Sequence, residues 1–454
     1  MKYIAALIKK ILTWTGINRA VFYFLVGKGF SFAATPVTLF LIATYFSPSE
    51  QGYYYTFSSL MGLSIFFELG LGVVITQFAS HEYVNLKWTE SGSLEGDVAS
   101  LSRFISLLRK SLKWYAVITS LFIAVVIPVG LKFFGSKPES VTVNYILPWI
   151  MLILFFGLNT TFIPLFSILE GCGKVAHVQQ LRVIQVVSGV LCSWTIIVLK
   201  GKLFAPSVEF VAYWFVILGW LIYNYKGLIL QLLHYESDPN YCISWSKEVF
   251  PMQWRVAVSW ISAYFMNYLF IPILFAYKGS VEAGKMGMSM KFSSLVFLLS
   301  MAWINTRVPY YGALIKQKKY KELDALALRS TLQAVFVGVL FSAAIVAGIM
   351  IINKYTGKYV NRILPEYIIG ILCFASIVSV INTSIAGYLR AHKQEPLMAI
   401  NIILAVVIAL STFITGKYSN ANIMVIAYTL VQIFIALPTF AYIFIKKRKE
   451  WHET

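Results

Sequence analysis

Long apolar runs recur along almost the whole of this sequence, and they constrain its fold more than any other feature. A helix that crosses a bilayer needs about 20 mostly apolar residues, because its backbone polar groups must be hydrogen-bonded within the segment. No Pro-, Ser- or Gly-rich linker separates the runs, so we predict about twelve spans in one continuous series. They lie near residues 20–46, 53–80, 112–134, 145–168, 176–199, 208–233, 249–277, 284–308, 328–352, 363–388, 396–415 and 421–445.

The composition excludes a water-soluble fold. Hydrophobic residues make up 59% of the 454 residues and charged residues only 13%, whereas an average soluble domain carries about 25% charged residues. A membrane β-barrel would show alternating segments of about ten residues, and these runs are continuous instead. The predicted fold class is therefore an all-α polytopic membrane protein.

The distribution of Lys and Arg predicts the orientation. Basic loops resist translocation, and most of the loop Lys and Arg residues fall on the side that includes both termini. We therefore predict a multi-pass protein of the bacterial inner membrane with both termini in the cytoplasm. Residues 1–19 are expected to form an amphipathic helix on the cytoplasmic surface, and residues 446–454 form a basic cytoplasmic tail.

Basic residues inside or at the rim of the predicted spans are the main functional signal. Each would cost about 2.5–3.5 kcal/mol if it were dry and unpaired at a helix centre. Only one acid, Glu68, lies deep in a predicted span, so most of this positive charge needs water or a bound anion. We expect a water-filled basic cavity that binds an anion such as a diphosphate. The cations are Lys28, Arg182, Arg255, Lys291 and Arg307.

Each of these residues has a structural alternative. Arg255 and Arg307 lie close to helix ends, where a long side chain can reach the headgroups. Glu68 is either a structural partner of Lys28 or a site for a coupling proton or Na⁺.

Polar residues on the fourth and fifth spans could contact a sugar. Gln179, Gln185 and Asn159 can hydrogen-bond sugar hydroxyls, but such side chains also join helices to one another. No cofactor or metal is expected, because the four cysteines are scattered and no metal-ligand spacing occurs.

The two halves of the sequence echo each other. The segment SPSEQG at 47–52 recurs loosely as GSVEAG at 279–284, and ILEGCGKV at 168–175 has a looser counterpart in YLRAHKQE at 388–395. Membrane transporters often contain such repeats. We predict a lobe of six helices over 20–233, a cytoplasmic linker over 234–248 and a second lobe of six helices over 249–445.

The sequence resembles the Wzx-type O-antigen flippases, which share a superfamily with the MATE drug exporters and the lipid II flippase MurJ. The resemblance spans most of the chain and rests on YFSPSEQGYYYTFSSL at 45–60, FFELGLGVVITQFASHE at 66–82, and ILEGCGKV followed by Gln179, Gln180 and Gln185. It implies two six-helix lobes around a cavity lined by basic residues. The implied activity is outward transfer of an undecaprenyl-pyrophosphate-linked oligosaccharide.

Two other classes of function remain open. A MATE-type exporter of organic cations would favour acidic residues in its cavity, and the predicted spans hold more bases than acids. A polysaccharide polymerase or glycosyltransferase would need a large external loop or an acidic metal-binding motif, so an enzyme is not expected. The expected partners are the lipid-linked oligosaccharide, membrane lipids and other polysaccharide-assembly proteins, with no nucleic acid.

Overall fold

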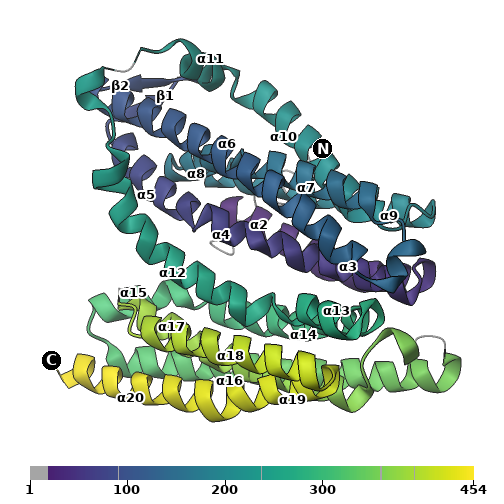
Figure 1. The fold of residues 1–454 in the computed structure, drawn as a ribbon. Helices are drawn as coiled ribbons and strands as arrows, with labels where there is room; N and C mark the ends of the chain where they lie inside the picture. Colours follow the sequence, from purple (N-terminus) through teal and green to yellow (C-terminus); the bar gives the residue numbers. More distant parts are fainter. Residues whose placement is uncertain (1–18, 90–91, 237, 358–359, 393, 454) are drawn as a thin grey trace, which may run out of the picture. The chain divides into compact units, whose positions relative to one another are not determined.

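The computed structural model is helical along nearly all of its length and describes residues 19–89, 92–236, 238–357, 360–392 and 394–453 (Figure 1). Ten of its helices are long and apolar enough to cross a membrane, or up to twelve spans if each bent helix pair counts as one. The predicted all-α polytopic fold is therefore confirmed. The expected surface helix at 1–19 lies almost wholly outside the described residues.

The chain forms two compact units. The first comprises residues up to Tyr45 and Leu63–Trp260, and the second comprises Phe46–Gly62 and Ile261–Thr454. The elements of the first unit are α2 (Arg19–Tyr45), α4 (Ile65–Glu68), α5 (Leu71–Tyr83), β1 (Leu86–Trp88), β2 (Leu94–Gly96), α6 (Val98–Gly135), α7 (Ile146–Thr160), α8 (Ile163–Gly171), α9 (Val175–Val198), α10 (Phe204–Asn224), α11 (Lys226–His234) and the start of α12 (Phe250–Asn267).

The second unit holds the remaining helices. They are α3 (Pro48–Met61), the rest of α12, α13 (Phe270–Lys278), α14 (Ser280–Asn305), α15 (Val308–Lys316), α16 (Tyr320–Thr356), α17 (Glu366–Ala391), α18 (Met398–Tyr418), α19 (Ala421–Val431) and α20 (Leu437–Glu453). This division differs from the predicted lobes in two respects. The segment 234–248 belongs to the first unit, and α3 belongs to the second.

The second predicted span is a broken helix. Its first part, α3, begins with a capping box in which Ser47 and Glu50 bond each other's backbone N–H groups, at 3.2 and 2.7 Å. It breaks at Leu69 and Gly70, which both have positive φ angles, 52° and 67°. A Cβ at Gly70 would also stand 2.5 Å from Val256, so glycine is required there by both conformation and space.

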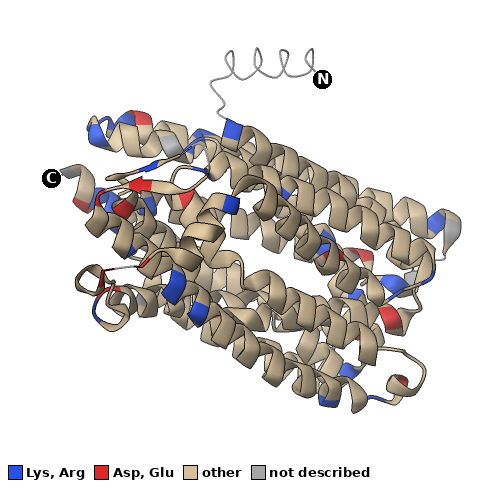
Figure 2. Cartoon of the chain, turned by 90° about the horizontal axis from the view of Figure 1, so that it is seen from above, with Lys and Arg blue, Asp and Glu red and all other residues tan. Residues whose placement is uncertain are grey.

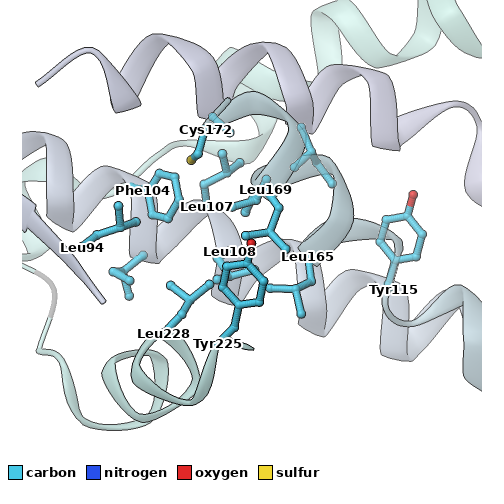
Figure 3. Close-up of a cluster of buried hydrophobic side chains, with 14 of the residues drawn as sticks. Leu94, Phe104, Leu107, Leu108, Tyr115, Leu165, Leu169, Cys172, Tyr225 and Leu228 are labelled. Carbon is cyan, nitrogen blue, oxygen red and sulfur yellow. The ribbon is translucent and has the colours of Figure 1, made fainter. Parts of the chain in front are cut away.

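A large apolar cluster forms the core of the first unit (Figure 3). Leu108 of α6, Leu169 of α8 and Leu228 of α11 are among its side chains, all 1% exposed or less. Cys172 lies in the same cluster, where burial raises the pKa of its thiol to about 12. The thiol is therefore protonated at neutral pH and behaves as a small apolar group.

Helix lengths depart from the predicted spans where charged turns extend them. The helix α6 begins at Val98, well before the predicted start at 112, and α16 begins at Tyr320, before 328. Their first turns carry charged residues that apolar runs cannot reveal, and Figure 2 shows charged residues mostly toward helix ends. The predicted span 208–233 is split at Tyr225, so α10 and α11 are separate helices.

Candidate functional site

Two helices from distant parts of the sequence run side by side in the first unit and form a polar pocket. The position for a Cβ on Gly27 of α2 lies 3.3 Å from the Val183 side chain of α9. Further along, the indole N–H of Trp194 donates to the Thr38 hydroxyl at 2.9 Å. Both contacts join residues 156 positions apart, so α2 and α9 run parallel over this stretch.

The pocket between α2 and α9 has a volume of about 290 Å³ and contains both Lys28 and Arg182. Hydroxyl and amide groups share its wall with these cations. The lining side chains are those of Tyr23, Phe24, Lys28, Ser31, Gln179, Arg182, Val183, Gln185, Val186 and Tyr213, with the backbone of Gly27. We call this space the basic pocket. The combination of two cations with neutral hydrogen-bonding groups suits a ligand that is anionic at one end and polyhydroxylated beside it.

The two cations of the basic pocket have different surroundings. The Arg182 guanidinium donates to Glu170 of α8 at 3.1 Å, and the two side chains are 53% and 23% exposed. The Lys28 ammonium lies over the Phe24 ring, 5.6 Å from its centroid. An ion pair this exposed is worth only about 0–1 kcal/mol, so Arg182 can exchange Glu170 for an anionic ligand at little cost.

The structure brings some of the predicted residues together and separates others. Gln179 and Gln185 line the basic pocket with Lys28 and Arg182. Asn159 is not among the lining residues, because its amide donates to the carbonyls of Phe155 and Phe210, at 2.6 and 2.9 Å. That position corresponds to the helix-joining alternative.

The other predicted cations lie outside the basic pocket. Lys291 is exposed on α14 of the second unit, and Arg307 is exposed at the break between α14 and α15. Arg255 lies on α12, where only its backbone is described. The sequence therefore overestimated how many cations share one space.

Glu68 occupies a different cavity from Lys28, so the proposed pair of these residues is not formed. The Tyr115 hydroxyl donates to Glu68 at 3.3 Å. A narrow space of about 10 Å³ adjoins them, lined also by the hydroxyls of Thr119 and Thr160, which bond each other at 3.0 Å. This volume accommodates about one water molecule or one small ion.

Sequence reasoning missed several residues of these sites. Glu170 was placed beyond the end of the fourth span, and its pairing with Arg182 depends on the turn between α8 and α9. Tyr23, Ser31 and Tyr213 were not singled out either. For Tyr23 and Ser31 a signal was present, because helical spacing puts them on one face of α2 with Gly27.

Solved structures share this fold. No protein family profile matches the sequence, and no curated protein matches it. The inward-facing conformation of a multidrug resistance MATE family transporter of the MOP superfamily matches with a TM-score of 0.65 and 15% identity, over 93% of this chain and 96% of the other.

Further matches belong to the same family. The outward-facing conformation of a MATE family transporter has a TM-score of 0.56 and 12% identity, over 96% of each chain. The MATE multidrug transporter DinF-BH in complex with a rhodamine dye has a TM-score of 0.59 and 14% identity, over 95% of this chain and 94% of the other. The chain therefore has the fold of these transporters and is a multi-pass membrane protein.

Proposed function

We propose that this protein is a flippase that moves an undecaprenyl-pyrophosphate-linked oligosaccharide of the O-antigen type from the cytoplasmic to the periplasmic leaflet of the bacterial inner membrane. The observation that carries the proposal is the placement of Lys28 and Arg182 in one pocket with Gln179 and Gln185. The transporter fold supports movement of a substrate across a membrane, and the chemistry of the pocket supports the identity of the substrate.

The basic pocket would bind the diphosphate through its two cations. The planar guanidinium of Arg182 can donate two parallel hydrogen bonds to phosphate oxygens, whereas Lys28 supplies a mobile point charge. The glutamines would contact the first sugar, while the polyprenyl chain stays in lipid. Alternating exposure of the pocket to the two sides would complete the transfer.

The main rival is a MATE-type exporter of small molecules. The fold supports it equally, and DinF-BH was solved with a bound dye. The lining of the basic pocket disfavours an organic cation, because its charged side chains are Lys28 and Arg182. The nearby Glu170 is already paired with Arg182.

Glu68 is the proposed site of the coupling cation, a proton or Na⁺. Its cavity has room for about one small ion, and Tyr115 supplies a hydrogen bond. A carboxylate within the membrane is costly unless it is protonated or paired with a cation. Loading and unloading of Glu68 would therefore supply free energy to the transport cycle.

The test of the flippase proposal is complementation of a bacterial strain that lacks its own O-antigen flippase. Wild type is expected to restore surface polysaccharide. Lys28→Ala and Arg182→Ala, at equal membrane abundance, are expected to reduce it at least about tenfold, because each removes a charge-assisted contact with phosphate. Arg390→Ala is the matched control, because Arg390 is 52% exposed and paired with Glu395 at 2.7 Å, much as Arg182 is with Glu170.

Two results would count against the flippase. If wild type restores polysaccharide in no O-unit background but expels a cationic rhodamine dye from cells, the exporter is the better assignment. If wild type restores polysaccharide and both pocket variants do so equally well, the flippase stands and the basic pocket is not its binding site.

Glu68→Gln tests the coupling role separately. The purified variant is expected to bind inorganic pyrophosphate like wild type, because Glu68 lies in another cavity, but to lose transport driven by an imposed proton or Na⁺ gradient in vesicles. The gradient that drives wild-type transport identifies the ion. Gradient-driven transport by Glu68→Gln at the wild-type rate would exclude Glu68 as the coupling site.

A further inference from the structure

A second polar cavity, of about 340 Å³, lies in the second unit where several helices begin or end. We call it the terminal pocket. Ligand sites in proteins commonly measure about 300–1,000 Å³, so this one has room for a small ligand or for part of a glycan. Its lining residues are Glu282, Lys285, Asn353, Asn361, Ile363, Leu364, Pro365, Glu366 and Asn422.

Four helices supply the polar groups of the terminal pocket. Glu282 and Lys285 come from the first turns of α14, and Asn353 comes from the last turn of α16. Glu366 opens α17, and Asn422 lies in the first turn of α19. The segment between α16 and α17 adds Asn361. These groups converge although they come from distant parts of the sequence.

The charges of the terminal pocket already have partners within it. The Lys285 ammonium donates to Glu282 at 2.8 Å, and the Asn353 amide donates to Glu366 at 2.7 Å. A free anion would meet two carboxylates, and a free cation would meet the ammonium of Lys285. The pocket therefore favours an uncharged polar ligand.

Its remaining groups match a sugar ring. Asparagine amides both donate and accept hydrogen bonds, as sugar hydroxyls do, and carboxylate oxygens accept from hydroxyls. The side-chain oxygen of Asn353 is buried and lacks a hydrogen-bond partner among the described residues, so it offers an unused acceptor. Ile363, Leu364 and Pro365 supply an apolar surface for the C–H face of a ring.

We propose that the terminal pocket is a carbohydrate site that binds an uncharged sugar of the transported glycan. The link to transport rests on the proposed function, whereas sugar binding itself rests on the pocket alone. On the predicted orientation, α14, α17 and α19 begin on the periplasmic side, so the site would hold the glycan on the side of release.

Binding of free sugars to the purified, detergent-solubilised protein tests this assignment. Saturation-transfer NMR would be recorded with galactose, rhamnose, N-acetylglucosamine and N-acetylgalactosamine, together with isothermal titration of inorganic pyrophosphate. Saturable binding of at least one sugar is expected. Asn361→Ala and Glu366→Gln should weaken it at least about tenfold and leave pyrophosphate binding unchanged.

The controls separate folding and the two sites. Asn361 is exposed, so its truncation should not disturb folding, and Asn267→Ala is a matched change at an exposed asparagine outside the pocket. Lys28→Ala should show the reverse pattern, with pyrophosphate binding weakened and sugar binding retained.

The outcomes also distinguish this site from the flippase itself. Absence of saturable binding for every sugar in the panel, or binding that both pocket variants leave unchanged, would overturn the carbohydrate site. Binding of Na⁺ or Ca²⁺ that is lost in Glu366→Gln, without sugar binding, would replace it with a cation site. If sugar binding follows these variants but complementation fails, the site stands and the flippase function does not.

Discussion

The ion pair between Arg182 and Glu170 determines how strongly Arg182 attracts an anion. The pair spans 3.1 Å and is partly exposed to solvent, so it contributes little to stability. While it is formed, the charge of the guanidinium is offset by the carboxylate. An incoming diphosphate must compete with Glu170 for the same donors, so Glu170 is expected to lower the affinity of the basic pocket.

Removal of the Glu170 charge should therefore strengthen anion binding. Glu170→Gln is expected to tighten pyrophosphate binding by up to about fivefold, the equivalent of the 0–1 kcal/mol typical of an exposed pair. Isothermal titration of the purified protein measures this. Glu395→Gln, which releases Arg390 from a similar pair, should leave the affinity unchanged. Unchanged or weaker binding by Glu170→Gln would show that Arg182 does not contact the anion.

At the level of elements, the two echoed segments of the sequence lie against each other. A Cβ on Gly52 of α3 would overlap the carbonyl of Ser280 at the start of α14. In turn, a Cβ on Gly284 would lie 3.3 Å from the carbonyl oxygen of Pro48. An offset of 232 positions relates one contact to the other, because Gly52 corresponds to Gly284 and Pro48 to Ser280. This reciprocal contact is consistent with the predicted internal repeat.

The same junction contains a buried polar contact. The amide of Gln51, 1% exposed, donates to the carbonyls of Gly284 and Arg362 at 2.9 and 2.8 Å. Close approach of the two helices places Gln51 within reach of both acceptors. The glycines therefore permit the approach, and Gln51 makes it specific.

Added bulk at this junction should destabilise the second unit. Gly52→Ala would force a Cβ into the Ser280 carbonyl, which cannot move aside as a flexible side chain can, so we expect a cost of about 1–3 kcal/mol. Gly284→Ala should cost less, because its Cβ would stand 2.9 Å from the nearest atom, the Gly52 nitrogen. Thermal unfolding in detergent gives the comparison.

Gly348→Ala is the control for this series. Gly348 lies within α16, and a Cβ there would meet no atom within 4 Å, so this variant should be as stable as wild type or slightly more stable. Equal unfolding temperatures for all three alanine variants would contradict a tight junction between α3 and α14.

Across the whole molecule, the chain passes between its two compact units three times. The crossings fall at Tyr45–Phe46, Gly62–Leu63 and Trp260–Ile261. The segment 234–248, predicted to be the linker, is not one of them. Relative movement of the units would therefore need changes of backbone conformation near these crossings, and not in that segment.

Side chains of α6 hold the segment 234–248 to the first unit. Arg103 donates to Glu82 at 2.8 Å and to Glu248 at 2.6 Å. Lys110 donates to the carbonyl of Ile243 at 2.5 Å, and Arg109 donates to the carbonyl of Tyr235 at 2.6 Å. The segment is thus a folded part of the first unit.

Loss of these contacts should expose the segment to protease. Trypsin is expected to cut the purified wild type only slowly after Lys247, whose side chain is exposed but whose backbone is helical. Arg103→Ala combined with Lys110→Ala should accelerate that cut. Cleavage in the basic turn at 316–319 provides an internal control and should not change. Equal rates after Lys247 in both proteins would show that these contacts do not hold the segment.

The sequence by itself determined the membrane fold and the kinds of residue that matter. Apolar runs report on their surroundings locally, because every stretch of helix in lipid must be apolar whatever it packs against. They also identified Lys28, Arg182 and Glu68 as costly side chains that require a partner, water or a ligand.

Only the tertiary structure decided which of these residues meet. The parallel packing of α2 and α9 joins Lys28 to Arg182 across 154 positions of sequence, and the turn after α8 supplies Glu170. Glu68 was left to Tyr115, and α3 was joined to the second unit. Such pairings depend on close contact between side chains of separate helices, and hydrophobicity along one helix carries no information about which helix becomes its neighbour.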